Sequence, residues 1–158
     1  MLEQTLCLNA STFTEGNAET CPTGRILPVA GTPMDFTRAK PIGRDIQAEY
    51  SQLQMCGGYD HNFILDKEPG MLALAAVARS EKTGITMETY TTQPGVQLYT
   101  SNSLQNDTRP GKTGGIYGRY QGFCLETQHY PCTPRTPNFP LWSCAPARNI
   151  TKRRFINS

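Results

Sequence analysis

The chain of 158 residues is long enough for one domain or for a part of a larger one. Fifteen Lys and Arg residues against 13 Asp and Glu residues give a net charge of +2, which excludes a phosphate-binding charge balance for the chain as a whole. Charged residues make up 18% of the chain, below the roughly 25% of an average globular domain. Fourteen glycines and 12 prolines indicate many turns, so the composition favours a β protein over a helical bundle.

Apolar runs in the chain are short. The longest, Leu72–Ala78, is far below the roughly 18 residues that a membrane-spanning helix needs. The N-terminus has no cationic start followed by an apolar stretch, so we predict no signal peptide and expect a cytoplasmic protein without a membrane partner. The six cysteines form no Cys-x-x-Cys pair, and in a cytoplasmic chain we expect free, mostly buried thiols.

In chain order, the first predicted strands are Glu3–Leu8 and Arg25–Val29, and a turn at Pro22–Gly24 precedes the second. The segment Ala30–Thr37 contains a glycine and a proline, so it is predicted to form a loop. Both strands are short and both are bounded by turn-forming residues. This pattern is typical of a β protein with long connections.

The best candidate for a helix is Asp45–Met55. Ile46, Tyr50 and Leu53 follow one another at the spacing of one helical face. The pattern predicts a helix of about three turns. The glycine at position 57, followed by a second one, is expected to end it.

Five further strands are predicted, at Asn62–Leu65, Leu72–Arg79, Ile85–Thr91, Val96–Thr100 and Phe123–Thr127. Pro69-Gly70 is the predicted turn between the first two. Pro94-Gly95 matches positions i+1 and i+2 of a type II turn, which predicts a hairpin between the third and the fourth. A polar loop is expected over Ser101–Gly115. Several short strands at fairly regular spacing predict an all-β sandwich or barrel.

Sequence motifs for cofactors and metals are incomplete. Gly111-Lys112-Thr113 resembles the end of a phosphate-binding loop, but position 106 is asparagine where that motif needs glycine. His61 and His129 lack cysteine or carboxylate partners at zinc-ligand spacing. The sequence also has no Gly-x-Ser-x-Gly elbow of a serine hydrolase. The sequence therefore predicts no cofactor and no metal.

A set of motifs resembles one known family. In chain order they are LPVAGTPMDF (27–36), PIG (41–43), GGYDHNF (57–63), YTTQPGVQLYT (90–100), GFCLETQH (122–129) and PNFP (137–140). With these motifs in this order, the chain resembles the galactose mutarotase family, also called the aldose 1-epimerases. Residues 1–140 are accordingly predicted to be the C-terminal half of such a domain.

The resemblance implies part of a large antiparallel β-sandwich of the galactose mutarotase type, with one short helix. It also implies a groove that binds a hexose such as galactose or glucose and interconverts its α and β anomers without a cofactor. A family glutamate, which corresponds to Glu126, takes the proton of the anomeric hydroxyl while a histidine protonates the ring oxygen. The family aspartate that binds sugar hydroxyls corresponds to Asp60, and a glutamine that is a sugar contact corresponds to Gln97.

The acid histidine of the family has no counterpart in this chain. The resemblance places it, with a second histidine and an Asn-Arg pair, in the N-terminal half of a domain about twice as long as this chain. His61 follows Asp60 directly and would point to the opposite face of an extended strand. His129 is an odd three positions from Glu126, so it also falls outside the face of that glutamate.

The tail over residues 141–158 departs from the family. It holds no acid and four cations, which are Arg148, Lys152, Arg153 and Arg154. One shifted reading frame of plausible codons gives AVVLRPGEEYHETTVYKF, which is the ending expected of the family. We therefore hypothesise that the tail from about residue 141 is a frameshifted readthrough and not a patch that binds nucleic acid. Genomic reads without an extra or missing base would contradict this hypothesis.

Two functions of different classes remain open from the sequence. The first is an aldose 1-epimerase, with Glu126 as base and with Asp60 and Gln97 as sugar ligands. The second is a truncated, non-catalytic remnant that binds sugar weakly or not at all. Between them lies complementation, in which a separately encoded N-terminal half supplies the missing histidines.

Overall fold

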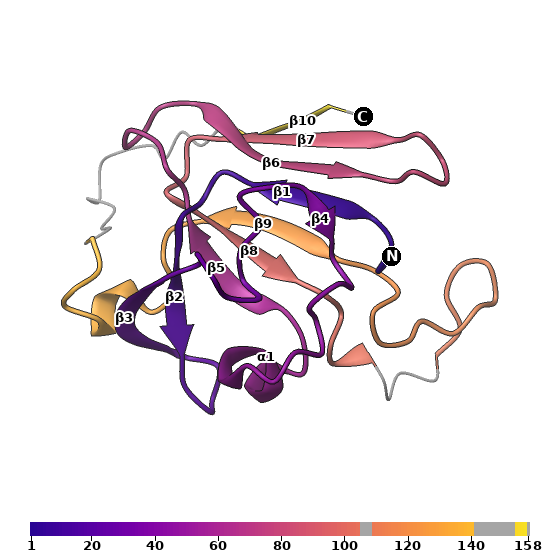
Figure 1. The fold of residues 1–158 in the computed structure, drawn as a ribbon, viewed down its shortest axis with the longest axis horizontal. Helices are drawn as coiled ribbons and strands as arrows, with labels where there is room; N and C mark the ends of the chain where they lie inside the picture. Colours follow the sequence, from indigo (N-terminus) through magenta and orange to yellow (C-terminus); the bar gives the residue numbers. More distant parts are fainter. Residues whose placement is uncertain (105–108, 141–153, 158) are drawn as a thin grey trace.

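The computed structural model describes residues 1–104, 109–140 and, for the backbone, 154–157. In these residues two antiparallel sheets lie over one another, with a short helix at one end (Figure 1). The elements are β1 (Thr5–Leu8), β2 (Thr12–Gly16), β3 (Pro22–Pro28), β4 (Lys40–Pro41), α1 (Ser51–Cys56), β5 (Asp60–Ile64), β6 (Ala73–Arg79), β7 (Thr86–Thr91), β8 (Gly95–Tyr99), β9 (Cys124–Gln128), the 3₁₀ turn Thr133–Arg135 and β10 (Arg154–Asn157).

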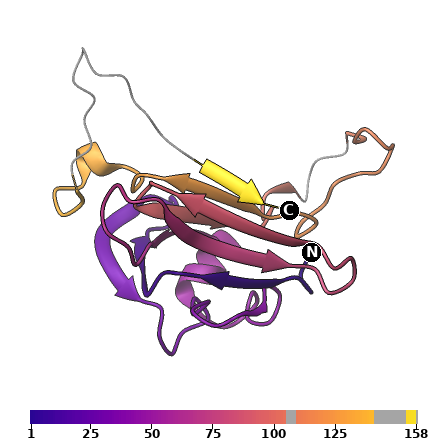
Figure 2. The ribbon, with the colours of Figure 1, turned by 90° about the horizontal axis from the view of Figure 1, so that it is seen from above.

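The first sheet has the strand order β10-β7-β6-β1-β4 and is called the β1 sheet here. The second has the order β3-β2-β5-β8-β9 and is called the β5 sheet. Figure 2, turned by 90°, shows the β1 sheet from above with the β5 sheet beneath it. The predicted all-β sandwich with one short helix is therefore confirmed.

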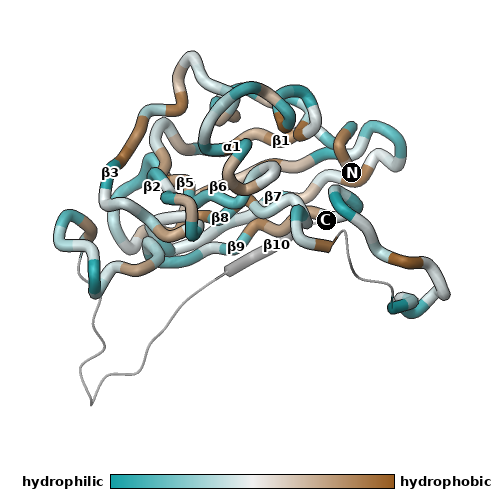
Figure 3. The backbone as a smooth tube through the Cα atoms, turned by 90° about the horizontal axis from the view of Figure 1, so that it is seen from below, coloured by the Kyte–Doolittle hydropathy of each residue, from teal (hydrophilic) through white to brown (hydrophobic). Residues whose placement is uncertain are grey.

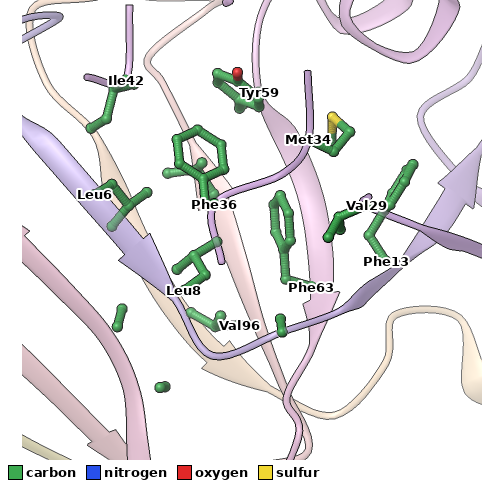
Figure 4. Close-up of a cluster of buried hydrophobic side chains, with 14 of the residues drawn as sticks. Leu6, Leu8, Phe13, Val29, Met34, Phe36, Ile42, Tyr59, Phe63 and Val96 are labelled. Atoms are coloured by element: carbon green, nitrogen blue, oxygen red, sulfur yellow. The ribbon is translucent and has the colours of Figure 1, made fainter. Parts of the chain in front are cut away.

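The core lies between the two sheets. Phe63 and Val96 from the β5 sheet face Leu6 and Leu8 from the β1 sheet, and all four side chains are buried (Figure 4). Phe36 adds an edge-to-face contact with Tyr59 at 5.1 Å between ring centres, although it lies in a loop. Each fully buried side chain of this size contributes roughly 1.5–3 kcal/mol of transfer free energy. This core gives the β5 sheet a firm inner face and leaves its outer face for polar side chains.

One predicted hairpin is wrong. The strands β7 and β8 do not pair, because β7 pairs with β6 and β10, whereas β8 pairs with β5 and β9. Gly95 also lacks the positive φ that a type II turn requires. The Thr92–Pro94 connection instead crosses from one sheet to the other, held by a bond from the Leu65 N–H to the Pro94 carbonyl at 3.0 Å. Alternation indicates which face a side chain takes, and it carries no information on the partner strand.

The predicted helix is shorter than its apolar spacing suggests. Helix α1 begins at Ser51, because Tyr50 has extended backbone and residues before it form turns. The Asp45 carboxylate accepts a bond of 2.7 Å from the buried Lys40 ammonium, which anchors these turns. Ile46 and Leu53 are both buried, so these spaced apolar residues pack into the core although no continuous helix joins them. Gly57 ends the helix as predicted, with φ at 62°.

Other boundaries differ in detail. The predicted turn at Pro22–Gly24 is instead the start of β3, and the strand β2 was not predicted. The turn at Pro69-Gly70 is confirmed by a bond from the Met71 N–H to the Glu68 carbonyl, with φ of Gly70 at 76°. Of the predicted tail, 141–153 and 158 lie outside the described residues. The backbone of 154–157 forms β10 beside β7.

The five cysteines that the structure describes are free, as predicted, but none is fully buried: Cys21, Cys124 and Cys132 are exposed, and Cys7 and Cys56 are half-buried. The expectation of mostly buried thiols is wrong, because Cys7 and Cys124 lie on outer strand faces, Cys21 and Cys132 lie in connections and Cys56 ends α1. Cys144 lies outside the described residues. Across the described ranges, no helix has the length and the apolar character to cross a membrane.

Candidate sugar-binding site

Three neighbouring strands build the outer face of the β5 sheet. In β5, β8 and β9 alternate side chains point to opposite faces, and each of these strands carries both hydrophilic and hydrophobic residues (Figure 3). The register sets Asn62 opposite Gln97 and Gln97 opposite Glu126. Asp60 precedes Asn62 by two positions, so it shares their face. One row of polar side chains therefore crosses the sheet from β5 to β9.

This face carries an open hollow of about 360 Å³. All three site residues predicted from the sequence line it. The complete lining is Asp60, Gln97, Tyr99, Ser103, Glu126, Gln128 and Pro131. The structure thus brings together side chains that are 66 positions apart in the chain.

Hydrogen bonds order one wall of the hollow. The Gln97 amide donates from Nε2 to Oδ1 of Asp60 at 2.8 Å. Gln128 donates from its Nε2 to the Gln97 Oε1 at 3.2 Å. Glu126 is exposed, and among the described residues its carboxylate has no hydrogen-bond partner. The hollow therefore combines an oriented amide–carboxylate pair with an exposed carboxylate on the same face.

His61 lies on the other side of the same sheet, as its position after Asp60 predicts. Its side chain is 3% exposed and meets the Phe13 ring edge-on at 5.9 Å. Its Nδ1 accepts the Asp60 backbone N–H at 3.1 Å, and Cys56 Sγ lies 3.8 Å from Nε2. Burial lowers the pKa of His61 to about 4, so the ring is neutral at neutral pH. This histidine cannot supply a proton to the hollow.

Five residues of this region were not predicted from the sequence, and they are Asn62, Tyr99, Ser103, Gln128 and Pro131. Gln128 follows Glu126 by two positions, Tyr99 follows Gln97 by two, and Asn62 follows Asp60 by two. Strand alternation was the signal that could have found all three. Ser103 comes from the loop after β8, where its hydroxyl lies 2.5 Å from the Tyr99 hydroxyl. A loop residue of this kind has no periodic signal.

The chemistry of the hollow suits a neutral polyhydroxylated ligand. Carboxylate and amide groups bind hydroxyls as acceptors and donors in fixed directions. In the described ranges 1–104 and 109–140, no three His, Cys, Asp or Glu side chains gather closely enough to hold a metal ion.

Comparison with known proteins shows the family of the chain. The family model described as aldose 1-epimerase matches residues 1–153. Galactose mutarotase of Sus scrofa is 38% identical over 133 residues, which cover 84% of this chain and 37% of that protein. Aldose 1-epimerase of Haemophilus influenzae is 37% identical over 142 residues, which cover 89% of this chain and 38% of that protein.

Solved structures show the same fold. A crystal structure of an aldose epimerase homologue from C. elegans superposes with a TM-score of 0.77 at 27% identity and covers 98% of this chain and 43% of that one. Galactose 1-epimerase from Lactobacillus acidophilus gives a TM-score of 0.69 at 28% identity, covering 82% and 36%. The chain thus spans somewhat more than a third of the length of the curated relatives it matches. On these matches, the chain belongs to the aldose 1-epimerase family.

Proposed function

We propose that this chain provides the base and the sugar ligands of an aldose 1-epimerase, which interconverts the α and β anomers of hexoses such as galactose and glucose. One observation carries the proposal: the Glu126 carboxylate, which has no hydrogen-bond partner among the described residues, lies on the same open face as the hydrogen-bonded pair of Asp60 and Gln97. Two relatives are named galactose mutarotase and aldose 1-epimerase, which supports the same reaction class.

The reaction needs one acid and one base. Glu126 takes the proton from the anomeric hydroxyl, the bond between C1 and the ring oxygen breaks, and a proton donor protonates that oxygen. The open aldehyde rotates about the C1–C2 bond, and reversal of the proton transfers closes the other anomer. Both anomers are neutral and no electron changes hands, so these steps require no cofactor.

Among the described residues, no histidine lines the hollow, so the acid of this reaction is missing there. His61 is neutral and buried on the far side of the sheet. We propose that a separately encoded polypeptide, equivalent to the N-terminal part of the family domain, supplies the acid histidine. The competing function is a non-catalytic remnant that binds sugar weakly or not at all.

Polarimetry of fresh α-D-galactose tests this proposal, with the uncatalysed rate subtracted. The chain alone is expected to match the background, and the chain mixed with the N-terminal part of a mutarotase relative is expected to exceed it. In that mixture Glu126→Gln should lower the rate by about 10²- to 10⁴-fold, because the base is lost.

Glu49→Gln is the matched control, since Glu49 is exposed and does not line the hollow. A mixture that stays at background would favour the remnant. A mixture whose rate survives Glu126→Gln would overturn the role of Glu126.

A further inference from the structure

We propose that Gln128 is a positioning residue of the hollow, because it holds the Gln97 amide in the one orientation that presents Nε2 to Asp60. This inference rests on the proposed function, in which Asp60 and Gln97 hold the sugar. Gln128 itself is half-buried at the end of β9 and lines the hollow.

Three side-chain amides and one carboxylate form a continuous chain of hydrogen bonds. Gln128 Nε2 donates to Gln97 Oε1 at 3.2 Å and makes a longer contact of 3.4 Å with Asn62 Oδ1. Gln97 Nε2 then donates to Asp60 Oδ1 at 2.8 Å. Asn62 is 1% exposed, so the far end of this chain is anchored in the protein interior.

Gln97 lies between a donor and an acceptor, so its two neighbours favour the same orientation of its amide. An amide has a donor end and an acceptor end, and either can face a neighbour unless something decides between them. The Gln128 NH₂ group can only donate, so it pairs with the oxygen of Gln97. The Gln97 nitrogen is then left for the Asp60 carboxylate, which can only accept while it is ionised.

A flipped Gln97 would place its oxygen against the Asp60 carboxylate. Two acceptors at that distance repel, and the carboxylate would turn away or lose its ordered position. Among the described residues, Oδ2 of Asp60 has no hydrogen-bond partner, so the ordered carboxylate offers it to a sugar hydroxyl. The orientation of the Gln97 amide thus sets the orientation of the Asp60 carboxylate, which is the group proposed to bind the sugar.

Gly95 makes the contact between Gln128 and Asn62 possible. It lies on β8 opposite Gln128 on one side and opposite Ile64 on the other. A Cβ at this position would lie 2.5 Å from Asn62 Oδ1, closer than real Cβ atoms come. Because glycine has no Cβ, the amides of β5 and β9 can meet across the strand that separates them.

The test removes or inverts the donor at position 128 in the ¹⁵N-labelled chain. Q128M removes the donor without adding charge, and Q128E replaces it with an acceptor. The readout is the pair of side-chain N–H signals of Gln97, identified by their absence in Gln97→Glu. In the wild type one proton of this pair should be displaced downfield by its bond to Asp60, and both variants should abolish that displacement.

Galactose affinity is the second readout, measured by titration of the same samples. Q128M should weaken binding about fivefold, the equivalent of one ordinary hydrogen bond, and Q128E should weaken it further because it drives Gln97 to flip. Gln54→Glu is the control, since Gln54 is exposed on α1 and does not line the hollow.

The outcomes separate this inference from the proposed function. Unchanged Gln97 signals in both variants would overturn the positioning role, whether or not the sugar binds. Suppose instead that the wild type does not bind galactose, but the Gln97 signals differ between the wild type and the Q128M variant. The positioning role then stands and the proposed function fails. A purely structural Gln128 would lower stability and leave the Gln97 signals in place.

Discussion

Asp60 and His61 show how two neighbouring residues acquire opposite properties. The strand directs Asp60 to the outer face, where Gln97 bonds its carboxylate, and directs His61 into the core. The identity of each side chain suits its side, because an ionised carboxylate requires polar partners and a buried imidazole is held neutral. The site therefore depends on the pleat of β5 as much as on the residue types.

The buried imidazole predicts a pH dependence of stability. The folded pKa of His61, about 4, lies below its ordinary value of 6.5. Below pH 6.5 the unfolded chain binds a proton at His61 that the folded chain does not bind. The stabilisation is therefore complete above pH 6.5 and is lost as the pH falls toward 4, by about 3 kcal/mol in all.

Urea unfolding at pH 7 and pH 5 measures this effect. The free energy of unfolding of the wild type should be about 2 kcal/mol lower at pH 5 than at pH 7 from this group. The His61→Gln variant should lack that component, whatever its absolute stability. Equal pH dependence in the wild type and the variant would show that folding does not lower the pKa of His61.

At the scale of elements, the β5, β8 and β9 strands hold the site because their register brings Asn62, Gln97 and Glu126 into one row. The central strand β8 contributes Gly95, whose missing side chain leaves room for amides from both neighbours. Side chains from all three strands therefore form the site, and their relative positions depend on how closely the strands approach one another.

Gly95→Ala tests the close approach. The added Cβ would lie 2.5 Å from Asn62 Oδ1 and 3.2 Å from its Cγ, so the buried amide must shift. We expect a loss of about 1–3 kcal/mol in the free energy of unfolding, measured in urea, and a loss of galactose affinity like that of Q128M. Gly115→Ala is the control, because a Cβ there meets nothing within 4 Å. Equal stabilities of the two variants would contradict the account.

Much of the site could be predicted from the sequence. Alternation placed Gln97 and Glu126 opposite the apolar side of their strands and separated His61 from Asp60, and the structure agrees. Which strands pair with each other could not be predicted. The alternation of apolar and polar residues in Thr86–Thr91 and Val96–Thr100 fits strands in two different sheets as well as it fits one hairpin. The bonds between Gln128 and its partners depend on register across β8, which local pattern does not contain.

In the whole molecule, the chain forms a two-sheet sandwich with its own core while spanning somewhat more than a third of the length of the curated relatives that it matches. In the described part, β3 and β9 end the β5 sheet and each pairs on one side. Glu126 lies on such an edge strand, so a further polypeptide added beside β9 would adjoin the proposed base directly.

Galactose titration of the ¹⁵N-labelled chain, followed by NMR, shows whether this hollow binds the sugar, and it needs no proton donor. The side-chain signals of Gln97 and Gln128 should shift in a saturable way, together with backbone signals of β5, β8 and β9. Asp60→Asn should weaken binding about 10- to 100-fold, since it removes a charged hydrogen-bond acceptor. Absence of shifts up to the solubility limit of the sugar, or shifts confined to the β1 sheet, would contradict the assignment of this hollow as the sugar site.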